Sequence, residues 1–338
     1  TARELVDQGA ARLRNDRSID TDLRASLLTD LGNVYHSLGE LKQARSLFDE
    51  IRTMTDLGTG TRQQALMAHA RVLLTDSDYA AAEHIADALD AMQRSLPATD
   101  VARIETTILR AEIDLQQRRA GQVISTLERL LDDWPAGSDQ AQLRADVLCL
   151  LAEAQADEQH YDLALPLLRR ALIDYQATHA SATTLNSTRH EIARSLGAMN
   201  QFDEALPAFQ AVLAEHTRIL GADHPLSLST KGEIADLLKR MHRFEEASAL
   251  FKDVIDSKRR TLGANHDDLA VALFNYGSLL YVRDEFASAL PYFEEAAKIW
   301  AANFGDDGDR TLTARDAMAS VRAEIGDTSR ATSEMAMI

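Results

Sequence analysis

Apolar and small residues recur along the chain at a regular interval, which divides the sequence into repeats. An aromatic or large apolar residue is followed three positions later by alanine in six copies: Leu41 with Ala44, Tyr79 with Ala82, Tyr161 with Ala164, Phe202 with Ala205, Phe244 with Ala247 and Phe286 with Ala289. These anchor alanines are 38, 82, 41, 42 and 42 residues apart. A degenerate copy, Ala120 with Val123, divides the interval of 82, and a worn copy, Thr328 with Ala331, ends the series. A fixed period of this length indicates a repeat architecture.

A second set of positions supports the same repeat. Twelve residues before each anchor the side chain is small, at Gly32, Ala70, Ala111, Ala152, Ala193, Ala235, Gly277 and Ala319. Four residues after each anchor it is apolar, at Phe48, Ala86, Leu127, Leu168, Phe209, Phe251, Phe293 and Met335. Two antiparallel helices pack tightly only where one side chain is small and a bulky neighbour fills the remaining space. Each repeat is therefore predicted to be a helix A, a short turn and a helix B.

The helical period and the residues at helix ends place these elements. In the segment 228–241, apolar or small residues follow a helical period rather than a period of two, and B helices are expected, for example, at 202–220, 244–262 and 286–304. We expect C-caps after the B helices at Gly58, Gly137, Gly221, Gly263 and Gly305. We expect N-caps of the following A helices at Thr99, Ser138, Asp223 and Asn265. No strand is expected.

The array reads as one domain. No low-complexity linker interrupts it, so residues 1–338 are expected to form a single solenoid. Residues 2–7 match residues 44–49, which indicates that the segment 1–14 is the second helix of a truncated repeat. The complete repeats follow at 22–325, and a last partial helix is expected at 326–338. We therefore expect an all-α fold of antiparallel helix pairs, and a fragment of a longer protein.

Composition supports this fold and narrows the choice of partners. Apolar residues are 45% of the chain and aromatic residues only 5%, which disfavours a sheet-rich fold. The formal net charge of −17 repels phosphate backbones and anionic lipid, so nucleic acid is not expected as a partner. No run of 18 apolar residues occurs, so no direct membrane insertion of this segment is expected. The single cysteine, Cys149, lies among apolar neighbours and is expected to be a buried small hydrophobe.

No arrangement of residues indicates catalysis. The ten histidines are scattered, no His-Glu-x-x-His occurs, and His224 and His266 lie one repeat apart, as turn residues of the repeat would. No Gly-x-Ser-x-Gly turn is present. We therefore expect no catalytic residue, no metal site, no cofactor and no enzymatic activity from these residues.

The repeat resembles the tetratricopeptide repeat (TPR). The first repeat carries the family pattern at Leu31-Gly32, Tyr35, Gly39, Ala44 and Phe48. The later period of 41–42 residues exceeds the usual length of about 34. Those later repeats resemble the kinesin-light-chain type, whose Gly-x-x-His-Pro turn is seen at 221–225 and echoed at 263–266. The resemblance implies a right-handed TPR-like α-solenoid, or superhelix.

A second resemblance concerns the start of the chain. Residues 2–10, followed by 23–35, are similar to the repeat regions that follow the kinase domain in some bacterial serine/threonine kinases. That resemblance implies the regulatory sensor region of such a kinase, on the periplasmic face of the inner membrane; otherwise a cytoplasmic location is expected. No kinase motif lies in these residues, so a kinase domain would lie upstream.

The TPR resemblance also implies a site. In this family the A helices line a concave groove, and the groove positions lie 18, 15, 14, 11, 8 and 7 residues before each anchor. Carried onto this chain, they give the candidate groove residues Asn33, His36, Arg71, His190, Arg194, Asp236, Lys239, Arg240, Phe274, Asn275, Ser278 and Tyr281, together with Asp30, Glu112, Glu153, Glu191 and Glu233. Each also has an alternative explanation as an exposed helix residue or as a partner in an ion pair between repeats. The seventh repeat is the sharper candidate, because Asn275 can bond a peptide amide while Phe274 and Tyr281 offer contact area. His190 beside Glu191 is a candidate pH-sensitive contact.

Three functions fit this picture. The first is a scaffold that binds a protein or peptide in the concave groove and regulates an attached kinase. The second is a regulator that responds to a small ligand or a signal peptide. The third is a structural assembly part that joins larger complexes through its ends. The sequence leaves the partner, the compartment and the oligomeric state open.

Overall fold

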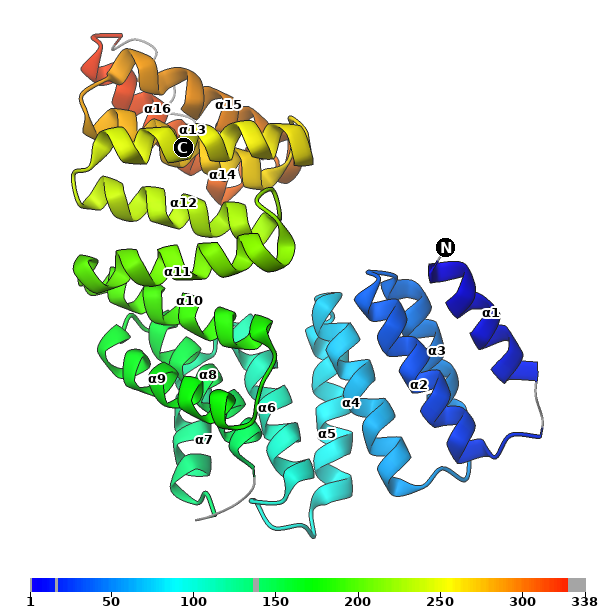
Figure 1. Cartoon of the computed structure of the whole chain (residues 1–338). Helices are drawn as coiled ribbons and strands as arrows, with labels where there is room; N and C mark the ends of the chain where they lie inside the picture. The colour runs from blue at the N-terminus through cyan, green and yellow to red at the C-terminus, as the bar shows by residue number, and fades with distance from the viewer. Residues whose placement is uncertain (1, 16–17, 136–139, 328–338) are drawn as a thin grey trace. The chain divides into compact units, whose positions relative to one another are not determined.

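The computed structural model describes residues 2–15, 18–135 and 140–327. Within these ranges it has sixteen α-helices and no strand (Figure 1). The helices are α1 (Ala2–Asn15), α2 (Thr21–Ser37), α3 (Leu41–Thr53), α4 (Thr59–Thr75), α5 (Tyr79–Gln93), α6 (Val101–Gln116), α7 (Ala120–Asp132), α8 (Ala141–Asp157), α9 (Tyr161–Ala177), α10 (Ala182–Ala198), α11 (Phe202–Leu220), α12 (Pro225–Arg240), α13 (Phe244–Leu262), α14 (Asp267–Val282), α15 (Phe286–Phe304) and α16 (Asp309–Glu324).

The helices pack in pairs, as the repeat pattern predicts. Within the repeats α2 packs on α3, α4 on α5, α8 on α9, α10 on α11, α12 on α13 and α14 on α15. The expected bounds of α11, α13 and α15 coincide with those observed. The prediction of an all-helical array of helix pairs is confirmed. The expected last partial helix at 326–338 lies outside the described residues apart from its first two positions, 326 and 327.

The chain divides into two compact units, Thr1–His179 and Ala180–Ile338. We call them the N-terminal and C-terminal units and describe each by itself. In the N-terminal unit the A helices α2, α4, α6 and α8 contact one another in sequence order. In the C-terminal unit α12 contacts α14 in the same way. The expectation of a single domain over 1–338 stays a prediction.

Each turn from helix A to helix B closes through one residue with left-handed backbone, five positions before the anchor. These residues are Gly39, Ser77, Arg118, Gln159, Asn200, His242, Asp284 and Gly326, with φ between 58° and 83°. The next amide then bonds back across the end of helix A; the N–H of Glu40, for example, donates to the carbonyl of Tyr35 at 2.9 Å. This is the usual way of satisfying the last carbonyls of a helix. The turn geometry therefore repeats even where the residue type does not.

The small residue of helix A faces the apolar residue of helix B, as expected. A Cβ added at Gly32 would lie 2.5 Å from Phe48 Cζ, and one at Gly277 would lie 3.0 Å from Phe293 Cε1. The alanines at the same position, Ala70 to Ala319, are all at most 3% exposed. The described apolar partners four residues after the anchors are also buried. This close approach sets the pairing of A with B and leaves the other face of each A helix available.

Four of the expected helix caps are wrong, three of them by one position. Gly221, Gly263 and Gly305 do end B helices with positive φ, but Gly58 has φ −56° and precedes α4 as its N-cap. The N-caps are Asp100, His224 and His266 rather than Thr99, Asp223 and Asn265. The histidines take this place because ring Nδ1 accepts from the amides of Leu226 and Asp268, at 3.2 and 3.1 Å. Gly137 and Ser138 lie outside the described residues.

Cys149 is not fully buried as expected. It lies half-buried on α8, on the side that faces α9 and Tyr175. The hydroxyl of Tyr175 donates to Asp146 Oδ1 at 2.6 Å, and this polar contact keeps the neighbourhood of Cys149 from being purely apolar.

Candidate functional site

The A helices of the N-terminal unit present one repeat position to a common surface. Residues eleven positions before the anchors are Asn33 on α2, Arg71 on α4, Glu112 on α6 and Glu153 on α8. All four line one of two hollows along these helices, and Arg71 lines both. We call this surface the N-terminal groove. The structure therefore places six of the predicted groove residues along this surface: Asp30, Asn33, His36, Arg71, Glu112 and Glu153.

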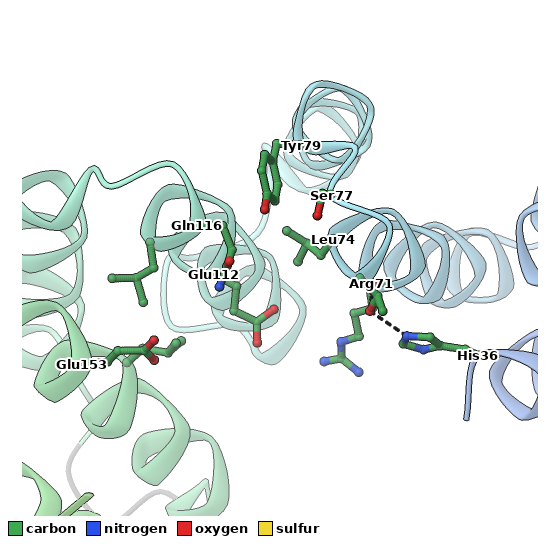
Figure 2. Close-up of a pocket in the computed structure, with 11 residues that line it drawn as sticks. His36, Arg71, Leu74, Ser77, Tyr79, Glu112, Gln116 and Glu153 are labelled. Atoms are coloured by element: carbon green, nitrogen blue, oxygen red, sulfur yellow. Dashed lines mark hydrogen bonds between the residues drawn. The ribbon is translucent and has the colours of Figure 1, made fainter. Parts of the chain in front are cut away.

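The first hollow has a volume of about 560 Å³ and mixes charged and apolar side chains. It is lined by His36, Arg71, Leu74, Thr75, Ser77, Tyr79, Glu112, Leu115, Gln116, Leu150 and Glu153. Figure 2 shows the guanidinium of Arg71 and the carboxylate of Glu112 directed from adjacent helices into the same open space. Glu153 lies beyond Glu112, on α8. Such a hollow offers both hydrogen-bonding groups and apolar area to a ligand.

Glu112 and Arg71 share this hollow without pairing. Within the described part of the chain, neither side chain has a hydrogen bond or an ion pair within 4 Å, and Glu112 is only partly exposed. Burial raises the pKa of Glu112, the charge of Arg71 opposes this, and the nearby Asp146 adds to it. A carboxylate removed from water without a partner is unfavourable, so Glu112 is poised to accept a donor.

The second hollow, of about 610 Å³, extends the groove toward the other end of α4. Asp30, Asn33, Arg71 and Glu105 contribute polar groups to its wall, and all four are exposed. Gln93 also lines it: this residue is 1% exposed, and its Oε1 has no hydrogen-bond partner in the described residues. An unpaired buried amide oxygen is uncommon and costs free energy of about 1–3 kcal/mol.

His36 has a structural contact inside the groove. The Thr75 hydroxyl donates to the carbonyl of Arg71 at 3.0 Å, so the His36 Nε2–H donates to Thr75 Oγ1 at 2.8 Å. This bond joins α2 to α4 (Figure 2). His36 therefore helps to position the wall, and its ring remains half-exposed to the hollow.

In the C-terminal unit His190 lies among acidic partners. Its Nε2–H donates to Glu233 on α12, and its Nδ1–H to Glu191 at 3.4 Å. Arg194 pairs with Glu191 at 2.9 Å. Burial of the imidazole opposes protonation, but the hydrogen bonds and charges of the two glutamates outweigh it and raise the pKa of His190 to about 9. The ring is therefore an imidazolium at neutral pH that links α10 to α12.

The candidates on α12 are also engaged. Lys239 pairs with Asp236 at 2.6 Å. The guanidinium of Arg240 donates to Asn200 Oδ1 at 2.9 Å and lies 5.2 Å from the ring centre of Phe202. The Lys239–Asp236 pair lies within α12, whereas the contacts of Arg240 hold the end of α12 against α11 and the turn before it, and leave Arg240 fewer donors for a ligand.

The seventh-repeat candidates serve packing. The ring of Phe274 contacts Phe293 and Trp300, with centroids 5.2 and 5.5 Å apart. Tyr281 packs on Phe286 at 5.2 Å, and the Ser278 hydroxyl donates to the carbonyl of Phe274 at 2.9 Å. Asn275 is half-exposed on the same helix. The aromatic rings of Phe274 and Tyr281 thus make contacts within the seventh repeat. A ligand role for this repeat stays a prediction.

Several lining residues of the N-terminal groove were not singled out from the sequence. Leu74, Leu115, Gln116 and Leu150 lie 8, 8, 7 and 14 residues before their anchors, so the repeat positions could have found them. Gln93 lies at the end of a B helix, where no groove position falls. Within the described ranges, no group of three or more His, Cys, Asp or Glu residues could hold a metal ion. No helix of the described residues is long and apolar enough to cross a membrane.

Comparison with known proteins identifies the repeat. Family models described as tetratricopeptide repeat match residues 24–55 and, in overlapping matches, 181–260, 228–296 and 268–333. No curated protein sequence matches the chain. Neither the matched models nor the structures described next concern a kinase, so the link to a kinase stays a prediction.

Solved structures are similar in fold. The apo form of RapI aligns with a TM-score of 0.69 at 12% identity, over 92% of this chain and 85% of that chain. NprR in complex with its cognate peptide NprX aligns with a TM-score of 0.60 at 13% identity, over 91% of this chain and 86% of that chain. A putative kinesin light chain from Podosopora anserina aligns with a TM-score of 0.50 at 20% identity, over 59% of this chain and 93% of that chain. At these identities the likeness shows the fold alone.

Proposed function

This chain is a tetratricopeptide repeat protein, and on that premise we propose that it is a peptide-responsive scaffold whose N-terminal groove binds a peptide segment. Its action is binding rather than catalysis. The single observation that carries this proposal is the pair of hollows of about 560 and 610 Å³ along the A helices, joined at Arg71. Each has the volume of a typical ligand site, and together they form an extended rather than a single deep site.

The chemistry of the wall suits a peptide. An extended chain rises about 3.3 Å per residue and carries a donor and an acceptor at every residue. The groove offers amide, carboxylate and guanidinium groups at Asn33, Glu112 and Arg71, spaced by the packing of successive A helices. Leu74, Leu115 and Leu150 add apolar area between them. Repeat proteins present such concave walls to extended partners.

The comparisons add weight to a regulator that responds to a peptide. The structure of NprR contains its cognate peptide, and this chain is similar to it in fold over 91% of its length. We therefore favour a signal-peptide-responsive regulator over a purely structural assembly part. We further propose that this chain is the regulatory region of a serine/threonine kinase whose activity responds to peptide binding. This proposal rests only on the resemblance of residues 2–10 and 23–35.

The proposal is tested by binding of random peptides. A library of randomised octapeptides displayed on beads is panned against the chain, and enriched peptides are measured by fluorescence anisotropy. We expect enriched peptides to bind the wild type, and to lose at least about tenfold in affinity with Arg71→Gln combined with Glu112→Gln. The matched control is Arg129→Gln with Glu128→Gln, two exposed residues of α7 that line neither hollow. Equal binding by both double variants, or no enrichment, contradicts the proposal.

A further inference from the structure

We propose that the N-terminal groove selects peptides through a cationic group, a lysine or arginine side chain or a free amino terminus, which binds at Glu112 between Arg71 and Glu153. This inference rests on the proposed function and names the chemistry of the ligand. The expected ligand is thus a basic peptide rather than an acidic one.

The repeat places the charges of the first hollow in a row. Arg71, Glu112 and Glu153 occupy the same repeat position on the successive A helices α4, α6 and α8. One guanidinium is therefore followed by two carboxylates along the wall, and all three border a single hollow. A ligand cation at Glu112 would lie beside the second carboxylate, while Arg71 would face a carbonyl or carboxylate of the flanking peptide.

Glu112 needs a donor that the described chain does not supply. Its carboxylate is partly buried, and it forms no hydrogen bond or ion pair with the described residues. Burial of an unpaired carboxylate is unfavourable, and an ammonium or guanidinium removes that penalty by a charge-assisted hydrogen bond. Arg71, across the same hollow, is exposed and forms no ion pair with Glu112, and its charge only partly offsets the effect of burial on the pKa of Glu112.

The second hollow also has acceptor groups that a ligand donor could satisfy. Its exposed acidic side chains are Asp30 and Glu105, against the one guanidinium of Arg71. Independently of any charge, the buried Oε1 of Gln93 lacks a hydrogen-bond partner in the described residues that line and surround it. An acceptor in this state is satisfied by an N–H group. The two groups that burial leaves without a partner along the groove, the Glu112 carboxylate and Gln93 Oε1, are thus both acceptors, which favours a cationic, donor-rich peptide over an anionic one.

Peptide binding at Glu112 is expected to depend on pH, and the neighbouring charged groups influence that dependence. Arg71 faces it from α4, Asp146 and Glu153 belong to α8, and His36 borders the hollow from α2. Glu112 must lose its proton to hold a cation, and burial raises the pKa of Glu112 from its ordinary value. Binding of a cationic peptide is therefore expected to weaken as the pH falls toward the acid range, and to recover as Glu112 ionises.

The test uses defined peptide pools and the whole chain. Hexapeptide pools carry lysine, glutamine or glutamate at one fixed position and random residues elsewhere, with amidated carboxyl ends, and each is made with an acetylated or a free amino terminus. Dissociation constants are measured at pH 7.5 and 5.0 for the wild type, Glu112→Gln, Arg71→Gln and the control Glu128→Gln. We expect the lysine pool to bind about tenfold tighter than the glutamate pool, and Glu112→Gln to remove both that preference and the pH dependence. Preference among the acetylated pools identifies a side chain, and preference confined to free termini identifies the amino terminus.

Three results separate this inference from the proposed function. Tighter binding of the glutamate pool, lost with Arg71→Gln, overturns the cationic ligand and leaves the peptide groove standing. Equal binding of all pools that Glu112→Gln does not change also overturns it. Failure of every pool to bind overturns the proposed function itself. Because Glu112 forms no hydrogen bond or ion pair with the described residues, and because burial of its unpaired carboxylate is unfavourable, Glu112→Gln is expected to melt at the wild-type temperature or roughly 1–2 °C above it.

Discussion

Gly32 on α2 lies directly against the ring of Phe48 on α3, so closely that a Cβ at Gly32 would be 2.5 Å from Phe48 Cζ. The same relationship recurs at Gly277 and Phe293, where the distance is 3.0 Å. It explains why the position twelve residues before each anchor is always small. The close crossing of helix A over helix B is what fixes the pair, and it also determines which face of helix A remains open for a ligand.

A methyl group at Gly32 is therefore expected to be destabilising. Gly32→Ala should lower the free energy of unfolding by about 1–3 kcal/mol, because the Phe48 ring is fully buried and must move. Gly277→Ala should cost less, since its nearest atoms are farther away. The control is Gly232→Ala in α12, where an added Cβ meets nothing within 4 Å and better helix propensity should add about 0.5–1 kcal/mol. Urea unfolding followed by circular dichroism measures all three; unchanged stability of Gly32→Ala would contradict this packing.

A second prediction concerns the residue with left-handed backbone in each A–B turn. Gly39 has φ 76° and open space around its Cβ position, so Gly39→Ala should cost about 1 kcal/mol through the backbone alone. Arg118 occupies the same turn position with φ 59°, and Arg118→Gly should raise the free energy of unfolding by up to about 1 kcal/mol. Opposite signs in denaturant unfolding support the turn geometry, and a loss of stability in both variants counts against it.

His190 makes the C-terminal unit sensitive to alkaline pH. Its pKa is raised to about 9 in the folded chain, above the ordinary value of 6.5, because Glu191 and Glu233 stabilise the imidazolium against the effect of burial. Its contribution to stability is therefore fully present below pH 6.5 and is lost as the pH rises through about 9. The charged or titratable groups facing it are Glu191 and Arg194 on α10, His216 on α11 and Glu233 on α12.

The corresponding experiment compares the wild type with His190→Gln between pH 6 and 10. The difference in free energy of unfolding should shrink across this range by about 1–3 kcal/mol, with Glu245→Gln, an exposed residue of α13, as control. A difference that stays constant with pH would show that His190 is neutral in the folded chain.

The groove variants should separate binding from folding. Arg71→Gln and Glu112→Gln break no hydrogen bond or ion pair among the described residues, so each should unfold within about 0.5 kcal/mol of the wild type. Arg144→Gln should instead cost about 2–4 kcal/mol, because Arg144 bonds the buried Asp174 with two nitrogens at 2.7 and 2.8 Å. Calorimetry distinguishes the two classes, and strong destabilisation by Glu112→Gln would give that residue a structural role.

Most of the fold can be predicted from the sequence because every repeat uses the same packing of helix A on helix B. The small residue at Gly32 or Ala193 and the apolar residue at Phe48 or Phe209 are side-chain requirements, and they are visible as spacing. The caps were misplaced because His224 and His266 accept through a ring nitrogen, a role that usually falls to Asp, Ser, Thr or Asn.

The candidate site was less predictable for a different reason. The repeat gives the same positions in every A helix, but it does not say which of them are filled by neighbours. Phe274 is covered by Phe293 and Trp300, and Lys239 by Asp236, whereas Arg71 and Glu112 border open space. That difference depends on tertiary contacts between side chains far apart in the sequence.

The most direct measurement is hydrogen–deuterium exchange of the chain with and without a peptide enriched by panning. A peptide in the N-terminal groove is expected to slow exchange in α2, α4, α6 and α8, around Asn33, Arg71, Glu112 and Glu153, and to leave α12 and α14 unchanged. Protection confined to α14 around Asn275, or to the B helices, would contradict the account and move the site elsewhere.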